Sequence, residues 1–245
     1  MVASWFWGGA RLPACWICAA SLVSTAKADP ALMERPPLAQ VIFGSLDSGS
    51  ATGFASVGVK RSLGYGGLDA SGFRAGLQWG AGAGPARRKP DIGKLYRTQS
   101  HAQLGYEWRI ADSFLALSVG AMVEAAYRET RDHLSLEHRR ALRLDGEIWS
   151  RLARNWVLQA SAYAVLADGN RYWARLATSW RVIGELYLGP ELEAYRERDY
   201  HKVRLGMHLA GLHFLGLDWR LGAGFQTSRN EASGTYVTLG LHWKR

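Results

Sequence analysis

The stretch VRLGMHLAGLHFLGLDWRLGAGFQTSRNEASGTYVTLGLHW, Val203 to Trp243, contains three consecutive runs in which apolar residues alternate with polar or small ones. Alternation with a period of two is typical of β-strands whose two faces meet different surroundings. The apolar faces are Val203, Leu205, Met207 and Leu209; Leu217, Trp219, Leu221, Ala223 and Phe225; and Val237, Leu239, Leu241 and Trp243. The other faces carry arginine, aspartate and glycine. Apolar residues outside and polar or small residues inside are the pattern of a transmembrane β-barrel.

The same alternation extends back to Leu38. It predicts segments of ten or more residues, the length that a tilted membrane strand needs. The expected strands are 38–48, 51–62, 70–82, 95–109, 112–127, 139–152, 155–167, 171–182, 184–197, 200–213, 215–227 and 233–243. We therefore expect an all-β fold, an antiparallel outer-membrane β-barrel of about 12 strands in which the last strand closes on the first.

The connections between these segments alternate in length, as in a barrel whose N-terminus lies in the periplasm. Tight turns are expected at 110–111, 153–154, 183 and 214. Longer polar loops are expected at 83–94, 128–138 and 228–232. The connection from Arg61 to Asp69 is Gly-rich and longer than a periplasmic turn should be, so the strand count is weakest there.

The first 28 residues form a segment of their own. Arg11 precedes an apolar stretch, and Ala26-Lys27-Ala28 gives an A-x-A pattern. This pattern predicts a cleaved secretory signal peptide. We therefore divide the chain into a signal peptide (1–28), a short N-terminal linker (29–37) and a transmembrane β-barrel (38–245) in the cell outer membrane. An uncleaved N-terminal anchor fits less well, because the apolar stretch is short and diluted by Ser and Thr.

Both cysteines, Cys15 and Cys18, lie in the predicted signal peptide. Their C-x-x-C spacing is therefore neither a redox motif nor a metal site in the mature chain. A lipoprotein signal at Cys15 fits poorly, because the apolar core continues past it. Removal of 28 of 245 residues leaves 217, and the loss of Arg11 and Lys27 lowers the formal charge from +9 to +7.

A basic, exported chain meets anionic lipid more readily than nucleic acid. We expect outer-membrane lipid and lipopolysaccharide phosphates as partners and no nucleic acid. The anion-facing residues are predicted in the loop at 83–94: Arg87, Arg88 and Lys89.

The alternation also predicts which polar side chains line the lumen. They are Arg74, Gln78, His101, Gln103, Glu107, Arg143, Asp145, Glu147, Arg151, Arg171, Arg175, Glu191, Glu193, Arg204, Asp218 and Arg220. Both signs of charge occur, so neighbouring strands can pair them and fill a narrow interior. The outward positions place Trp108, Tyr127, Trp156, Trp180 and Trp243 near strand ends, as in interfacial aromatic girdles.

A second group of lumen residues is aromatic with charged neighbours: Trp149, Tyr163, Trp173, Arg175 and Glu191. Aromatic faces beside carboxylates suit stacking on sugar rings and hydrogen bonding to their hydroxyls. The alternative is that these side chains pack the interior of the barrel.

Catalytic patterns are weak in this sequence. Asp199 with His201, and His133 with Asp132 and Ser135, lie in predicted outward loops, where solvated charges are the better explanation. The chain has no G-x-S-x-G, H-E-x-x-H or phosphate-binding loop. We expect no enzymatic activity, cofactor or metal.

Several short segments, in this order along the chain, resemble one known family. They are Gly44-Ser-Leu-Asp-Ser-Gly49, Leu68-Asp-Ala-Ser-Gly-Phe73, Tyr172-Trp-Ala-Arg-Leu176, Leu188-Gly-Pro-Glu-Leu-Glu193, Arg204-Leu-Gly206 and Gly234-Thr-Tyr-Val-Thr-Leu-Gly240. In order and spacing they resemble the BcsS family of bacterial cellulose biosynthesis proteins. The resemblance implies an outer-membrane protein encoded with a cellulose synthase system, with cellulose and its export components as partners and no assigned catalytic residues.

The function expected from these observations is non-catalytic assistance in the secretion or surface retention of a glucan. Two alternatives belong to other classes: an outer-membrane enzyme that modifies lipid or glycan, and a small porin. A soluble β-sandwich is the alternative fold, although its outward faces would not be continuous in Val, Leu and Trp.

Overall fold

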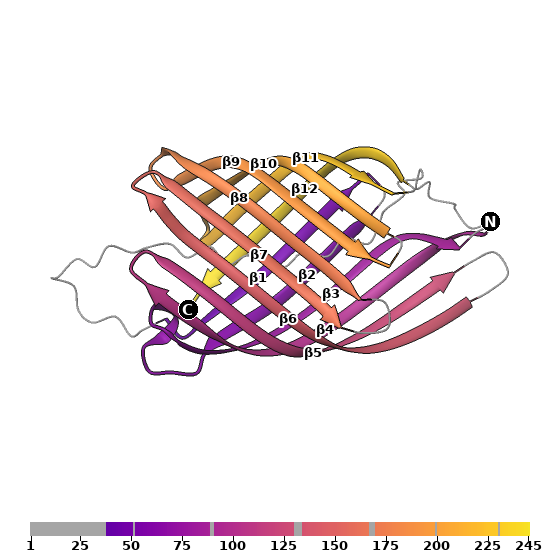
Figure 1. Ribbon diagram of the computed structural model, residues 1–245, viewed down its shortest axis with the longest axis horizontal. Helices are drawn as coiled ribbons and strands as arrows, with labels where there is room; N and C mark the ends of the chain where they lie inside the picture. The colour runs from indigo at the N-terminus through magenta and orange to yellow at the C-terminus, as the bar shows by residue number, and fades with distance from the viewer. Residues whose placement is uncertain are drawn as a thin grey trace.

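The computed structural model describes residues 38–50, 52–88, 91–129, 134–166, 170–198, 200–229 and 231–245, without the side chains of 86–88, 91, 92, 231 and 232. Within these residues the chain forms one closed antiparallel barrel (Figure 1). Its strands are β1 (Gln40–Gly49), β2 (Gly53–Ser62), β3 (Gly72–Arg88), β4 (Asp91–Ile110), β5 (Ser113–Glu129), β6 (Leu134–Ala153), β7 (Trp156–Leu166), β8 (Arg171–Ile183), β9 (Leu186–Glu197), β10 (Tyr200–Phe214), β11 (Leu217–Ser228) and β12 (Glu231–Lys244). No helix in this part of the chain is long and apolar enough to cross a membrane.

The strand number and the closure agree with the sequence prediction. Each of the twelve expected segments overlaps one observed strand, in order. β1 pairs with β12 from Val41↔Lys244 to Gly49↔Tyr236, so the last strand closes on the first. Closure pairs the backbone groups of every strand with neighbours on both sides, which is the condition for crossing a bilayer with strands.

The two faces of each strand also agree with the prediction. On β10 and β11, Leu205 is 64% and Phe225 73% exposed, whereas Arg204 is fully buried and Arg220 is 7% exposed. All the predicted lumen residues face inward and all the predicted girdle residues face outward. Trp108, Trp156, Trp180 and Trp243 lie at the end of the barrel where β1 begins and β12 ends, which we call the terminal end. Tyr127 lies at the opposite, distal end.

The connections at the terminal end are short, with one exception. β10 and β11 are joined by Leu215 and Gly216, both with positive φ (55° and 74°), as in the tight turns that join twisted strands. The exception is the connection between β2 and β3, which contains the short helix η1 (Gly67–Asp69). Leu68 is buried there, and its amide donates to the carbonyl of Leu38 (2.7 Å). The connection is therefore packed against the barrel, and it hides no further strand.

The prediction of long polar loops at the distal end is wrong. Pairing of β3 with β4 continues to Arg88↔Asp91, that of β5 with β6 to Glu129↔Leu134, and that of β11 with β12 to Ser228↔Glu231. A hairpin ladder satisfies its own backbone hydrogen bonds, so it can continue after the apolar alternation has stopped. Arg87 and Arg88 therefore belong to the end of β3, while Lys89, Asp132 and His133 lie outside the described residues.

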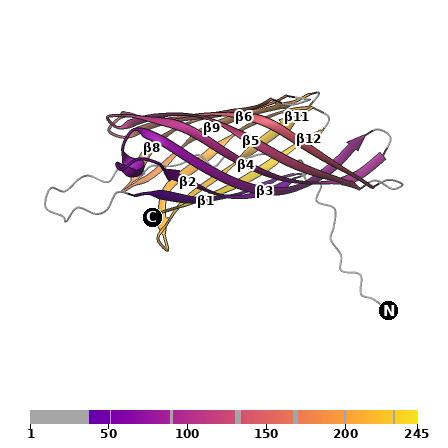
Figure 2. The same cartoon turned by 90° about the horizontal axis from the view of Figure 1, so that it is seen from below.

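These continuations make the barrel wall unequal in height. β3 to β6 have 17 to 20 residues, whereas β1 and β2 have 10 and β7 has 11. Pairing of β2 with β3 begins only at Gly53↔Ala83, and pairing of β6 with β7 only at Leu142↔Leu166. Residues 84–88, 91–99, 124–129 and 134–141 therefore form an extension, which we call the distal sheet. It projects at the right of Figure 1 and again in the view from below in Figure 2.

Candidate functional site

Many charged side chains point into the lumen, and most of them are paired. The pairs form three clusters at different distances from the terminal end. We call them the distal, central and terminal clusters. Several of their members, among them Asp47, Lys60, Arg97, Glu124 and Glu197, were missed in the sequence. Arg97 and Glu197 share strand parity with predicted lumen residues on β4 and β9, so a longer count of the same alternation would have found them. Asp47, Lys60 and Glu124 lie on β1, β2 and β5, for which no lumen residue was predicted.

The distal cluster bridges strands that are not neighbours. Arg171 on β8 contacts Glu124 on β5 (2.7 Å) and Glu197 on β9 (3.0 Å). Arg97 on β4 reaches Glu197 with its Nη1 (3.4 Å), and the hydroxyl of Tyr195 donates to the same carboxylate (2.6 Å). Because β4 and β9 lie on different sides of the barrel, these contacts cross the distal part of the lumen.

The central cluster joins the last strands of the barrel to the first. Arg204 on β10 donates to both carboxylate oxygens of Asp47 on β1, with Nη2 at 2.9 Å from Oδ1, and its Nε donates to Gln226 (3.1 Å). Glu191 accepts hydrogen bonds from Arg220, from Arg175 (3.2 Å) and from the hydroxyl of Tyr236 (3.1 Å).

The terminal cluster is organised around one buried carboxylate. Glu107, which is 1% exposed, is paired with Arg109 (2.7 Å) and Lys60 (3.4 Å). Lys60 also lies 3.8 Å from Glu147 on β6. Charges of both signs thus fill the lumen at three levels, as the mixed signs in the sequence predict.

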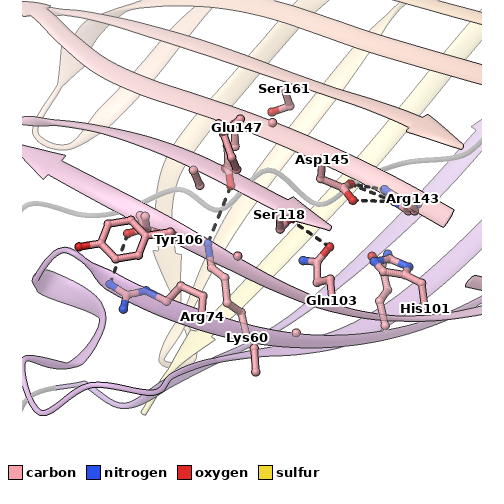
Figure 3. Close-up of a pocket in the computed structure, with 18 of the residues that line it drawn as sticks. Lys60, Arg74, His101, Gln103, Tyr106, Ser118, Arg143, Asp145, Glu147 and Ser161 are labelled. Atoms are coloured by element: carbon pink, nitrogen blue, oxygen red, sulfur yellow. Dashed lines mark hydrogen bonds and ion pairs between the residues drawn. The ribbon is translucent and has the colours of Figure 1, made fainter. Parts of the chain in front are cut away.

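A small cavity lies beside the terminal cluster, since Lys60, Glu107 and Glu147 line it together with His101 and Gln103. Figure 3 shows its lining, including Arg143, which donates to both carboxylate oxygens of Asp145, from Nη2 to Oδ1 (2.7 Å) and from Nε to Oδ2 (3.0 Å). Its volume is about 90 Å³. A cavity of about 150 Å³ is known to hold benzene. The cavity is therefore too small for a sugar ring unless side chains move.

The five lumen residues that sequence reasoning offered for glycan contact lie in three places. Tyr163 and Trp173 stack (centroids 5.5 Å apart) in a cluster with Met122, Val165 and Tyr195. Trp149 lies apart from them, stacked on Phe114 (6.4 Å). Arg175 and Glu191 belong to the central cluster. All five side chains are buried, so glycan contact remains a prediction that would require them to move.

The weak catalytic candidates do not form a site in the described chain. His201 is exposed on the outer face of β10, and Ser135 lies on the inner face of β6. Asp199, Asp132 and His133 are outside the described residues. Within the described ranges, no group of three or more His, Cys, Asp or Glu side chains could hold a metal ion.

The family model for cellulose biosynthesis protein BcsS matches residues 41–245. Among solved structures, the β domain of the Bordetella autotransporter BrkA has a TM-score of 0.54 and 13% identity, covering 84% of this chain and 99% of that one. An outer-membrane channel from Pseudomonas putida F1 has a TM-score of 0.54 and 12% identity, covering 89% and 100%. No curated protein matches this chain significantly. At these identities the structures show the fold alone, an outer-membrane β-barrel.

Proposed function

The chain belongs to the cellulose biosynthesis protein BcsS family, and from this premise we propose that it is a non-catalytic outer-membrane barrel that assists the secretion or surface retention of an extracellular glucan. Export by the predicted signal peptide, Met1 to Ala28, is part of the proposal, as is an orientation with the terminal end in the periplasm and the distal sheet outside.

The filled lumen is the observation that carries the scaffolding mechanism. A glucan chain passing through the barrel would have to separate the pairs Arg97–Glu197 and Arg204–Asp47. Removing one partner of such a buried pair costs about 3–5 kcal/mol in proteins. The barrel therefore acts on the glucan from its outer surfaces, as a rigid wall that holds the distal sheet in place.

Basic residues at the tip of the distal sheet supply the proposed contact. Arg87 and Arg88 end β3, and Lys89 follows them in the sequence. In the proposed orientation they meet lipopolysaccharide phosphates or the emerging polymer, for which positive charge is the suitable partner. Components of the cellulose export machinery are further proposed partners at this end.

The test is cellulose output and its partition between cell surface and medium in a deletion strain. The strain is complemented with wild type, with Arg87→Ser/Arg88→Ser/Lys89→Ser, or with Arg61→Ser/Arg154→Ser/Arg245→Ser. The last variant loses the same charge from exposed positions at the terminal end. We expect wild type and the terminal-end variant to restore retention and the distal variant to fail at equal outer-membrane levels. Unchanged output and partition in the deletion strain would refute a role with cellulose.

A further inference from the structure

The outer wall of the barrel carries a groove on β6 to β10. Two adjoining hollows of about 600 and 400 Å³ share the lining residues Gly146, Ala162, Ala174 and Ala194. These four residues pair in one row, Gly146↔Ala162↔Ala174↔Ala194, and Val203 continues it on β10. Their small side chains leave the wall hollow between two rows of larger ones.

The rows on either side give the groove its walls. One is Ile148↔Ala160↔Leu176↔Leu192↔Leu205, and the other begins with Leu144↔Ala164↔Tyr172. Both face outward, and Leu176, Leu205 and Tyr172 are 46–64% exposed. In a membrane-spanning wall this groove is open to lipid, and its lining suits a hydrocarbon chain.

The groove is inclined along the barrel axis. Gly146 lies in the middle of β6, whereas Val203 lies near the distal start of β10. Because barrel strands are tilted, a row at right angles to them rises along the axis. A chain lying in the groove would therefore run from the distal end toward the middle of the membrane.

Basic side chains stand at the distal end of the groove. The row of Tyr172 continues through Arg196 on β9 to His201 on β10, and both residues line the groove. Arg229, also exposed, lies beside them, since its amide donates to the carbonyl of His201 (3.0 Å). Among the described residues none of the three has an acidic partner, in contrast to the arginines of the lumen clusters.

We propose that this groove binds one acyl chain of a phosphorylated lipid of the outer leaflet, whose phosphate is held by Arg196, His201 and Arg229. Charge complementarity selects the phosphate, because arginine side chains recognise phosphate oxygens with paired hydrogen bonds. The apolar hollow directly below it selects the chain. This site is separate from Arg87, Arg88 and Lys89; it rests on the proposed orientation of the barrel but not on any role with cellulose.

The experiment is native mass spectrometry of the detergent-purified full barrel incubated with lipid A, with dephosphorylated lipid A or with inorganic phosphate. Arg196→Gln/His201→Gln/Arg229→Gln removes the charge, and Ala174→Leu/Ala194→Leu fills the groove. Ala102→Leu/Ala121→Leu is the control, since these paired alanines face outward elsewhere on the wall. Far-ultraviolet circular dichroism shows which variants are folded.

We expect wild type and the control to retain lipid A. The charge variant and the filled variant should each bind it roughly tenfold more weakly, as should wild type with the dephosphorylated lipid. Two results would overturn the proposal: lipid A bound equally by wild type and both variants, or full competition by inorganic phosphate, which would indicate an anion site without an acyl chain. If the filled variant does not fold, the charge variant and the dephosphorylated lipid decide.

Discussion

Arg204 donates hydrogen bonds to both carboxylate oxygens of Asp47, a residue 157 positions earlier in the chain, and neither side chain is exposed. The pair joins β10 to β1 over the strands that close the barrel. It therefore links the first strand to the last third of the chain inside the lumen as well as through the backbone ladder.

Changing one partner of this pair should destabilise the barrel. Asp47→Asn leaves the buried Arg204 with only Glu193 (3.4 Å) as a carboxylate partner, and the free energy of unfolding should fall by about 3 kcal/mol, the lower end of the range for a broken buried pair. The double variant Asp47→Leu/Arg204→Met should lose less than the sum of the two single changes, because neither member of the pair is left buried without the other. Guanidinium unfolding of the refolded barrel measures both. A double variant as unstable as the sum of the two single changes would contradict this account.

The wild-type barrel should conduct poorly. Three clusters cross or fill the lumen, so conductance in a planar bilayer should be far below that of an open porin. Arg97→Ala/Glu197→Ala should leave it low, because the central and terminal clusters remain. Large, steady channel openings in wild type would favour the small porin and remove the argument for a scaffold.

Two inward glycines on neighbouring strands should differ in their tolerance of alanine. A Cβ at Gly222 would lie 2.5 Å from Oγ1 of Thr238 and 2.7 Å from Oε1 of Glu191, which its hydrogen bonds hold in place. At Gly240 the nearest atom would be 3.6 Å away. Gly222→Ala should cost about 1–3 kcal/mol of stability and Gly240→Ala much less. The unfolding temperatures of the two variants are compared by electrophoresis of preheated samples on unheated gels, where the folded barrel runs as a separate band. Equal unfolding temperatures would show that Glu191 is free to move.

Substitutions of Trp173, which stacks on Tyr163, distinguish a packing role of this pair from contact with a glycan. If the pair only packs the lumen, Trp173→Ala should lower the free energy of unfolding by about 3–5 kcal/mol. Trp173→Phe should then keep most of that stability, and folded protein of either variant should restore normal cellulose partition to the deletion strain. The opposite pattern, in which Trp173→Phe unfolds like wild type yet does not restore partition, would make this pair a glycan contact.

The sequence was sufficient for the strands and their faces, because an apolar exterior imposes a period of two wherever the wall meets lipid. The sequence was insufficient to predict the ends of the strands where the alternation stops. Arg88 lies in a strand although the alternation has stopped, because the hairpin ladder alone keeps the backbone paired. Contacts across the lumen could not be predicted from the sequence either. Arg97 and Glu197 are 100 residues apart, and no sequence period relates side chains that meet through the interior of a barrel.

The unequal strand lengths remove rotational symmetry about the barrel axis. At the distal end the wall of β3 to β6 stands above its neighbours β2 and β7, which are 10 and 11 residues long. A polymer or protein that rests against the tall side fixes the azimuth of the barrel in the membrane as well as its depth. In the proposed orientation the molecule thus has a defined front at the cell surface, and a partner there would meet one side of the barrel only.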